Sequence, residues 1–395
     1  MRIAMIGPFG LRPNKTMGSR ALGLARSLIQ RGREVAIFMP PWQTPEEADR
    51  WWEEDGVILR YSTLGEQPFS TSRNLLDDVL AWKPDIVHGF KPKAYSGLAL
   101  WWLWQFHRRN LRLVVDMDDW EGPGGWNDLA PYSVVQKRFF SWQEKWGMAH
   151  AHALTVASRT LEGIVWSNGI AAERVHYLPN GSGLNFDTAV VTEEQIKEKR
   201  SELGLGSRPT LLIYSRFFEF DTRRLAEILA GVKKKIPELA VLTIGESLYA
   251  EDAQQLREHL ESNQVLSSII DLGWVAEGDL PLLLRAAGAA LYLMDDTLIN
   301  RSKCPVKLAD LIAAGVPVVA EDVGQVSEYV VNGVTGYLRP TGDIDGLSDY
   351  AMLLLQNKKI GAAFGQAAQR HYHDNFSWDR LATRLDAVYS MEISR

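Results

Sequence analysis

The chain has 395 residues, of which 46% are hydrophobic and 23% are charged, and its formal net charge is -6 at pH 7. These proportions argue against disorder and against a membrane-spanning class, and the length predicts two domains. The negative charge and the lack of a basic tail argue against a nucleic-acid partner. The single cysteine, Cys304, excludes an internal disulfide and fits a reducing compartment, so we expect a cytoplasmic protein.

Strands and helices alternate along the first half of the chain. The predicted strands span residues 2–6, 34–39, 56–60, 85–88, 111–116, 152–156 and 174–178. The predicted helices span residues 18–31, 73–82, 98–106, 132–150 and 159–167. Alternation at this spacing is typical of a doubly wound α/β domain with a mostly parallel sheet.

A turn-rich stretch at residues 179–183, Pro-Asn-Gly-Ser-Gly, predicts a hinge before a second alternating series. The strands of that series are predicted at 210–214, 240–244, 269–272, 289–293 and 316–320. Its helices are predicted at 192–203, 222–235, 253–262 and 280–286, with another that begins at Pro305. We therefore predict a first domain at 1–185, onto which a C-terminal helix at 377–395 packs back, and a second domain at 186–376.

The helix that begins at Pro305 carries a stripe of charge. Lys303, Lys307 and Asp310 follow one another at i, i+4 and i+7, which places them on one helix face. A helix N-terminus with two lysines suits an anion such as a diphosphate, and Asp310 could accept hydrogen bonds from a sugar hydroxyl. The alternative is that Lys307 and Asp310 form an exposed ion pair without a ligand.

The first predicted helix opens with Gly18 and Ser19, which leave its N-terminus accessible to an anion. The loop before it lacks the G-x-G-x-x-G pattern, and the second strand ends in Met39-Pro40 instead of an acidic residue. A dinucleotide-dependent dehydrogenase is therefore not expected.

An acidic, glycine-rich loop follows the strand predicted at 111–116. Asp118, Asp119 and Glu121 lie in this loop, and ligands of open α/β sheets bind at the carboxyl ends of strands. We predict that these carboxylates orient the hydroxyls of a bound ligand; the alternative is that they are solvated charges. His88, at the end of its own strand, is a further candidate for the same ligand site, although a core histidine fits the pattern equally well.

Tryptophan is unusually frequent, with 14 residues, several of them in the helix predicted at 98–106. His107, Arg108 and Arg109 follow this run, so one hypothesis is an amphipathic helix that contacts an anionic membrane surface. We favour the alternative of a core-facing helix with a polar end, because the run is apolar nearly all round.

Short motifs occur in a fixed order along the second half of the chain. They are Pro179-Asn-Gly181 with Phe186, Ile270 to Val275, Lys303-x-Pro-x-Lys-x-x-Asp310, Ala313 to Val319, Asp322-Val-Gly324, Glu328 and Asn332 to Gly336. In this order the chain resembles, over essentially its full length, the retaining GT-B glycosyltransferases of family four (glycosyl transferases group 1). The resemblance implies two Rossmann-like, doubly wound parallel-sheet domains that face each other across a cleft. The first domain would bind the acceptor and the second the donor.

The resemblance also implies roles for individual residues. Arg216 matches the family's phosphate-binding arginine, and with Lys307 it is predicted to stabilise the leaving group. Asp118 occupies the position of a catalytic histidine, which implies a different acceptor arrangement around Asp118, Asp119 and Glu121. The predicted donor-binding residues are Gly18, Ser19, Trp274, Val275, Lys303, Cys304, Pro305, Val306 and Asp310.

The implied reaction is transfer of a hexose from a nucleotide-diphosphate sugar to an acceptor hydroxyl, with no cofactor and no metal. The acceptor could be a sugar, a lipid-linked sugar or a small molecule. Two positions depart from the family pattern: Ser302 replaces a glutamate and Asp221 replaces a lysine. The alternatives are therefore a nucleotide-sugar epimerase and a non-catalytic nucleotide-sugar-binding homologue.

Overall fold

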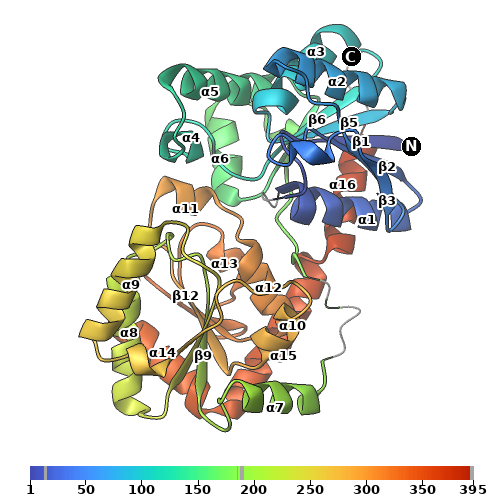
Figure 1. The fold of residues 1–395 in the computed structure, drawn as a ribbon. Coiled ribbons are helices and arrows are strands. Elements are labelled where there is room, and N and C mark those ends of the chain that lie inside the picture. Colours follow the sequence, from blue (N-terminus) through green and yellow to red (C-terminus); the bar gives the residue numbers. More distant parts are fainter. Residues whose placement is uncertain (13–15, 185, 187–190, 392–395) are drawn as a thin grey trace. The chain divides into compact units, whose positions relative to one another are not determined.

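The computed structural model describes residues 1–12, 16–184, 186 and 191–391 (Figure 1). The chain forms two compact units. Unit 1 comprises the described residues of Met1–Gly181, Ser302–Cys304 and Ser377–Arg395, and unit 2 those of Ser182–Arg301 and Pro305–Phe376. Each unit is built on one parallel or mostly parallel sheet, which confirms the predicted α/β class.

The sheet of unit 1 has the strand order β3-β4-β2-β1-β5-β6-β7-β8. Its strands are β1 (Arg2–Ile6), β2 (Glu34–Met39), β3 (Trp51–Glu54), β4 (Val57–Tyr61), β5 (Ile86–Phe90), β6 (Arg112–Met117), β7 (Ala153–Val156) and β8 (Val175–Tyr177). All neighbours pair in parallel except β3, which is antiparallel to β4. The sequence analysis did not predict this edge strand.

Helices cover both faces of this sheet (Figure 1). They are α1 (Leu22–Gln30), α2 (Pro68–Ala81), α3 (Ala94–His107), α4 (Trp126–Leu129), α5 (Val134–Ala149), α6 (Arg159–Ser167) and α16 (Trp378–Ser390). A π-helical turn, Thr16–Ala21, precedes α1, and 3-10 turns lie at Pro45–Glu47 and Ala172–Arg174.

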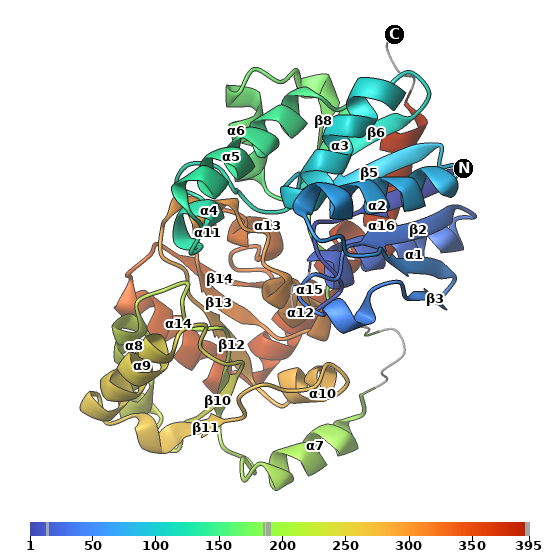
Figure 2. The ribbon, with the colours of Figure 1, turned by 45° about the horizontal axis from the view of Figure 1, so that its top comes forward.

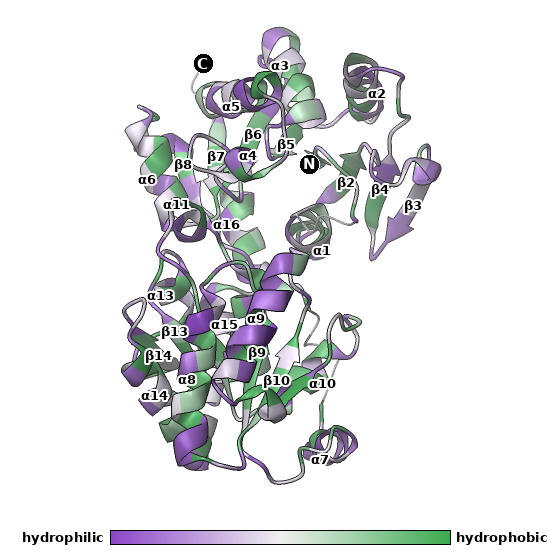
Figure 3. Cartoon of the chain, turned by 60° about the vertical axis from the view of Figure 1, so that its left-hand side comes forward, coloured by the Kyte–Doolittle hydropathy of each residue, from purple (hydrophilic) through white to green (hydrophobic). Residues whose placement is uncertain are grey.

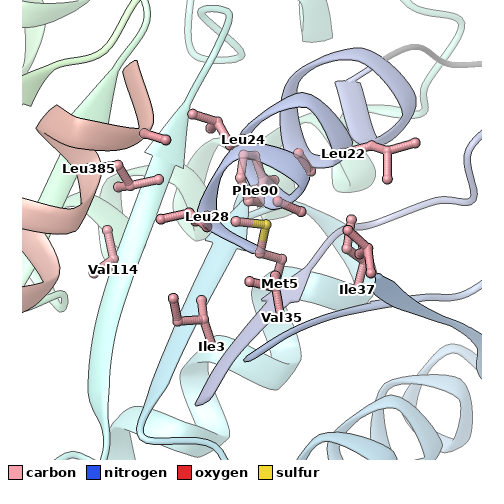
Figure 4. Close-up of a cluster of buried hydrophobic side chains, with 14 of the residues drawn as sticks. Ile3, Met5, Leu22, Leu24, Leu28, Val35, Ile37, Phe90, Val114 and Leu385 are labelled. Carbon is pink, nitrogen blue, oxygen red and sulfur yellow. The ribbon is translucent and has the colours of Figure 1, made fainter. Parts of the chain in front are cut away.

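The core of unit 1 lies between its central strands and the pair α1 and α16. Figure 4 shows Met5 of β1 among Leu24 and Leu28 of α1, with Leu385 of α16 close by. All four side chains are fully buried. A parallel strand that is buried on both faces reads as a continuous apolar run, which is why Arg2–Ile6 was recognisable in the sequence. The C-terminal helix is thus an integral part of unit 1.

Unit 2 contains an entirely parallel sheet with the order β11-β10-β9-β12-β13-β14. Its strands are β9 (Thr210–Tyr214), β10 (Ala240–Ile244), β11 (Ile269–Asp271), β12 (Ala289–Tyr292), β13 (Val318–Glu321) and β14 (Gly336–Arg339). Its helices are α7 (Glu193–Glu202), α8 (Thr222–Lys235), α9 (Ala250–Ser262), α10 (Leu280–Arg285), α11 (Leu298–Ser302), α12 (Val306–Ala314), α13 (Val326–Tyr329), α14 (Ile344–Gln356) and α15 (Lys358–Asn375), with a 3-10 turn at Leu266–Ser268. Figure 3 shows that α9 is largely hydrophilic, whereas the strands are mostly hydrophobic.

Each sheet has one point where the strand order reverses. In unit 1 the chain builds outward from β1 to β2 and then crosses to β5 on the other side of β1. In unit 2 it builds from β9 to β10 and β11 and then crosses to β12. Ligands of doubly wound sheets bind at the carboxyl ends of the strands at such switch points. A ligand site is therefore expected among the residues that follow β1, β5, β9 and β12.

Candidate active site

A pocket in unit 2 lies at the switch point between β9 and β12. Its wall includes Tyr214 and Ser215 at the end of β9, Tyr292 at the end of β12, and Lys307 from the first turn of α12. The Lys307 ammonium lies 4.5 Å from the centroid of the Tyr214 ring, a cation–π geometry. The structure therefore places a positive charge where a ligand of this sheet is expected to bind.

Gly245, directly after β10, allows the backbone to pass close to this pocket. Its φ is +110°, and a β-carbon at this position would lie 2.1 Å from the Ser215 carbonyl oxygen and 3.3 Å from Lys307 Nζ. Its N–H donates to the Gly273 carbonyl at 2.8 Å, which joins the loops after β10 and β11. A side chain at this position would displace the backbone beside Lys307.

Arg216 adds a second positive charge at the same edge of the sheet. It is exposed two residues after β9, and within the described parts of the chain its guanidinium pairs with no carboxylate. Asp221, where the family resemblance implied a lysine, instead caps α8 by accepting a hydrogen bond from the Arg223 N–H at 2.9 Å. Nearby Arg224 is held by Asp295 and other carboxylate contacts. Arg216 and Lys307 are thus two cations that follow β9 and β12 at the carboxyl edge of this sheet.

Asp310 lies one turn deeper in α12 and is 2% exposed. Its Oδ1 accepts hydrogen bonds from the Ser182 hydroxyl at 2.6 Å and the Gly183 N–H at 2.8 Å. Burial raises its pKa to about 6. The alternative of an exposed ion pair with Lys307 is therefore wrong: Asp310 ties the segment that opens unit 2 to α12.

The predicted stripe of Lys303, Lys307 and Asp310 is not one helix face. The helix α12 begins at Val306 with Pro305 as its N-cap residue, so Lys303 precedes it. Lys303 belongs to unit 1, where its ammonium lies 5.0 Å from the Trp126 ring of α4. The predicted helical spacing was wrong for Lys303 because it was extended past Pro305 to residues that are not helical.

Cys304 also belongs to unit 1, because two hydrogen bonds from Asn180 hold it there. The Asn180 N–H donates to Cys304 Sγ at 3.1 Å, and its side-chain amide donates to the Cys304 carbonyl at 2.7 Å. The Ser158 hydroxyl donates to the Ser302 carbonyl at 2.7 Å. Residues 302–304 therefore follow unit 1, and the chain divides after Gly181, whereas the sequence analysis placed residues 302–304 in the second domain and the boundary after 185.

Trp274 and Val275 follow β11 on the loop that the Gly245 contact fixes. The Trp274 side chain is 70% exposed, whereas Val275 is half-buried. An exposed indole can stack on a nucleotide base.

The carboxyl ends of β5 and β6 in unit 1 carry a dense group of charges, which we call the charge cluster: Lys91, Lys93, Asp118, Asp119 and Glu121. The Lys91 ammonium lies 2.8 Å from Asp119, 3.2 Å from Glu121 and 3.4 Å from Asp118. The Lys93 ammonium lies 2.7 Å from Glu121. Asp118 and Glu121 are each 7% exposed. Asp118 and Glu121 are therefore not solvated charges, whereas Asp119 remains partly exposed.

Within the charge cluster, the two lysines and the carboxylates shift one another's pKa values. Burial lowers the pKa of Lys91, but the surrounding carboxylates outweigh burial and hold that pKa well above its usual range. Burial acts to raise the pKa of Glu121, but Lys91 and Lys93 outweigh it and lower that pKa. Asp119 shows the reverse balance, since burial raises its pKa. Asp119 is also the most exposed of the three carboxylates, with a side-chain exposure of 25%.

Glu144 of α5 lies beneath the cluster. It is 3% exposed, and its Oε1 accepts a hydrogen bond from the Glu121 N–H at 3.1 Å. Its other oxygen, Oε2, is buried without a hydrogen-bond partner among the described residues. Burial raises the pKa of Glu144 to about 8, so this carboxyl is mostly protonated at pH 7.

Asp118 joins the charge cluster to the turn that holds Gly18 and Ser19. Its Oδ2 accepts a hydrogen bond from the Thr16 hydroxyl at 2.7 Å, and Thr16 begins the π-helical turn Thr16–Ala21. The structure thus brings this turn, predicted to bind the donor, together with a residue predicted to be catalytic. Both lie in unit 1.

His88 is a core histidine, which is the alternative that the sequence left open. It is fully buried in β5, its Nδ1 lies 2.7 Å from the Tyr389 hydroxyl and its Nε2 lies 3.1 Å from the Thr155 hydroxyl. Burial lowers its pKa well below 6.5. Its ring nitrogens are therefore engaged with α16 and β7.

Sequence reasoning missed the buried arginine of unit 1. Arg20 donates to both carboxylate oxygens of Asp116, at 2.8 and 2.7 Å, and to the carbonyls of Leu178 and Pro179. It also donates to the Asn180 side chain at 2.9 Å. Arg20 therefore fixes residues 178–180, where the first stretch of unit 1 ends. An arginine in a predicted apolar helix was the signal available in the sequence.

Two features are absent from residues 1–12, 16–184, 186 and 191–391. In that part of the chain, no group of three or more histidine, cysteine, aspartate or glutamate side chains is arranged to hold a metal ion. None of the helices described is both long and apolar enough to cross a membrane.

Comparison with known proteins identifies the family. Residues 15–181 match the model of the glycosyl transferase 4-like domain, and residues 195–371 match that of the glycosyl transferases group 1. A GDP-mannose-dependent alpha-(1-6)-phosphatidylinositol monomannoside mannosyltransferase of Mycolicibacterium smegmatis is 24% identical over 92% of this chain and 91% of its own. Among solved structures, a sucrose-phosphate synthase from Thermosynechococcus elongatus is 18% identical and has a TM-score of 0.73, with 98% of each chain covered. Anabaena Alr3699/HepE in complex with UDP-glucose is 17% identical with a TM-score of 0.70, covering 99% of this chain and 100% of its own. The chain has the GT-B fold, belongs to the group 1 glycosyltransferases and is a glycosyltransferase.

Proposed function

We propose that this glycosyltransferase moves a hexose from a nucleotide-diphosphate sugar to an acceptor hydroxyl with retention of the anomeric configuration. The observation that carries the proposal is the position of Lys307 in the pocket at the switch point of unit 2, with Arg216 exposed just after β9. Two comparisons support it, since one relative is named GDP-mannose-dependent and one solved neighbour holds UDP-glucose.

The chemistry assigns the two cations to the leaving group. As the bond between the sugar anomeric carbon and the phosphate oxygen breaks, negative charge develops on the nucleoside diphosphate. Fixed cations in a sheltered pocket stabilise that charge without reorganising, and Lys307 already has a fixed position over Tyr214. In a retaining transfer the acceptor oxygen bonds to the same face of that carbon, and its proton passes to the departing phosphate. This route needs neither a protein base nor a metal cofactor.

The remaining donor contacts follow from the positions of the loops. Trp274 would stack on the base, and the N–H groups at the start of α12, at Val306 and Lys307, would face the diphosphate. Asp310 would act through the Ser182 and Gly183 contacts that shape this end of unit 2. Lys303 and Cys304, which the sequence analysis also predicted to bind the donor, lie in unit 1.

The acceptor would bind at the charge cluster of unit 1. Asp119 is the most exposed carboxylate there, and its ion pair with Lys91 fixes its orientation. A carboxylate held in this way accepts hydrogen bonds from sugar or polyol hydroxyls. Asp118, bonded to Thr16, would orient the attacking hydroxyl.

Nucleotide release tests the proposal. The purified protein would be incubated with UDP-glucose and GDP-mannose and with polyol and glycolipid acceptors, and the free nucleotide diphosphate would be quantified. Lys307→Ala should lower release about 100-fold or more, because a group that stabilises the transition state is lost. Lys234→Ala, an exposed lysine of α8, removes the same charge elsewhere in unit 2 and should leave release unchanged.

Other outcomes would contradict the proposal in distinguishable ways. Conversion of the donor into another nucleotide sugar without free nucleotide would indicate an epimerase. Donor binding by thermal shift without any turnover would indicate a binding protein. A product with inverted anomeric configuration, seen by nuclear magnetic resonance, would refute retention.

A further inference from the structure

Tyr214 points toward the helix that carries Lys307. Side chains of a strand alternate between the two faces of its sheet, and Leu211 and Ile213 of β9 pack into the core formed with α8 and α14. Figure 2 shows α12 on the other side of this sheet from α8 and α14. Tyr214, the last residue of β9, therefore faces α12, and it forms the pocket wall together with Lys307.

The Tyr214 ring lies against the Lys307 ammonium. The distance from Nζ to the ring centroid is 4.5 Å, which is within the range of a cation–π interaction. Gly245 is also a neighbour, since a β-carbon there would lie 3.3 Å from the same Nζ. The position of the ammonium is therefore defined in part by a flat ring and in part by a glycine backbone.

The Tyr214 hydroxyl contacts the same helix one turn later. It donates to Asp310 Oδ2 at 3.5 Å, a long hydrogen bond, while Asp310 Oδ1 accepts from Ser182 and Gly183. Burial, together with the nearby carboxylate, raises the pKa of Tyr214 far above its usual range, so the phenol keeps its proton. Tyr214 thus contacts two residues of α12, Lys307 with its ring and Asp310 with its hydroxyl.

We propose that Tyr214 is a positioning residue that holds the Lys307 ammonium in the pocket by the face of its ring. A ring face attracts a cation through its quadrupole and carries no formal negative charge, so it does not cancel the charge of the lysine. Lys91 shows another way to hold a lysine, with carboxylates that offset its charge. In an inference that rests on the proposed function, the fixed ammonium stabilises the departing diphosphate without first being reoriented.

A double-mutant cycle tests the proposal through nucleotide release. Tyr214→Leu removes the ring but keeps an apolar side chain, and it should lower release about tenfold. The same change made in Lys307→Ala should have no further effect, because the ammonium on which the ring acts is gone. Tyr214→Phe, which keeps the ring and loses only the hydroxyl, should restore most of the release. Unchanged release in Tyr214→Leu, or an equal loss in both backgrounds, would overturn the proposal.

Fluorination separates the electrostatic attraction of the ring from its shape. Starting from Tyr214→Phe, ring hydrogens would be replaced by one, two or three fluorines, which weaken the negative face of the ring in steps with little change in size. Release should fall at each step if the ring face attracts the ammonium. A constant rate across the series would contradict the proposal, because packing alone does not depend on the ring quadrupole.

Tyr350→Leu is the matched control for the loss of a ring beside a cation. Tyr350 lies in α14 of the same unit, stacks on Tyr337 at 4.0 Å and has the Arg339 guanidinium 5.8 Å from its ring centroid. This variant should leave release unchanged at a temperature well below its unfolding transition. If Tyr350→Leu and Tyr214→Leu lower release equally, both act through stability and the positioning role is refuted.

The position of Lys307 can also be followed without turnover, by nuclear magnetic resonance. With lysine isotope-labelled at Cε, the Lys307 signal is the one that Lys307→Ala lacks, and protons above a ring face resonate upfield. We expect this signal upfield in the wild type and in Tyr214→Phe, and at the ordinary lysine position in Tyr214→Leu. An ordinary position in the wild type would refute the positioning role alone. An upfield signal in a protein that releases no nucleotide from any donor would refute the proposed function alone.

Discussion

The two units place lysines at equivalent points of their sheets but surround them differently. In unit 1, Lys91 contacts three carboxylates within 3.4 Å, and the side chains involved are mostly buried. In unit 2, Lys307 lies over an aromatic ring, and Arg216 pairs with no carboxylate in the described chain. The fold places the cations of both units at a switch point of the sheet, but only Lys91 is surrounded by three carboxylates.

The difference indicates which kind of ligand each unit can bind. A cation that carboxylates already neutralise contributes little to binding a diphosphate, but the fixed oxygens around it can accept hydrogen bonds from hydroxyls. Arg216, which pairs with no carboxylate in the described chain, can attract an anion and stabilise charge that develops during a reaction. This difference supports the proposal that the acceptor binds at the charge cluster and the donor phosphates at Lys307 and Arg216.

Removing Lys91 should produce the largest effect, and the effect should be on stability. Lys91→Met leaves Asp118, Asp119 and Glu121 buried without their central cation, which should cost about 3–5 kcal/mol in the free energy of unfolding. Lys307→Met, at a half-buried position beside an aromatic ring, should cost less than about 1 kcal/mol. Urea denaturation followed by circular dichroism compares the two variants. Equal costs would show that the charge cluster is not a closed ion-pair network.

Removing Arg216 should produce the opposite pattern. Arg216→Gln should lower nucleotide release by a factor of about 100 to 1,000, or roughly 3–4 kcal/mol of transition-state stabilisation. Its free energy of unfolding should stay within about 0.5 kcal/mol of the wild type, because the side chain is exposed. The matched control is Arg257→Gln on α9, which removes an exposed arginine paired with Glu261. Unchanged release in Arg216→Gln would remove Arg216 from the leaving-group site.

A third comparison concerns the backbone on which the unit 2 site depends. Gly245→Ala would place a β-carbon against the Ser215 carbonyl at a φ of +110°, so we expect a cost of about 1–3 kcal/mol in stability. Gly278→Ala is the control, since nothing lies within 4 Å of its prospective β-carbon. The affinity for nucleotide diphosphate, measured by calorimetry, should fall in Gly245→Ala only. Equal affinities would show that Lys307 does not depend on this close approach.

The sequence predicted the elements whose signals are local. The helix Thr222–Lys235 was predicted at its observed bounds, because Asp221 provides a cap and the apolar positions repeat with the helical period. The strand β3 was missed, although Asp55 and Gly56, with φ of 52° and 80°, form the tight turn of its hairpin. An Asp-Gly pair between two short apolar stretches is a hairpin signal.

The site was only partly predictable, because its contacts join distant parts of the chain. Parallel pairing of β5 with β6 puts Phe90 opposite Asp116, which brings Lys91 to the acidic loop. The sequence analysis predicted both strands and the acidic loop, but it did not consider the lysines that follow β5. The position of Lys303 ahead of α12 could not be predicted for a related reason, since only the folded chain shows that it lies against Trp126.

The last prediction concerns Glu144, whose carboxyl lies beneath the charge cluster with Oε2 unpaired among the described residues. Its pKa is about 8 in the folded chain and 4.5 without burial, so between these values the folded state holds a proton that the unfolded state has released. Stability should therefore fall as the pH rises from about 5 to 8, by up to about 1.4 kcal/mol per pH unit. Glu144→Gln keeps an oxygen for the Glu121 N–H and has nothing to titrate. Urea denaturation at pH 5, 6, 7 and 8 should give a flatter profile for this variant, with its largest gain over the wild type at pH 8. Parallel profiles would mean that Glu144 is ionised in the folded state. Its negative charge would then add to those of the carboxylates that contact Lys91 and Lys93.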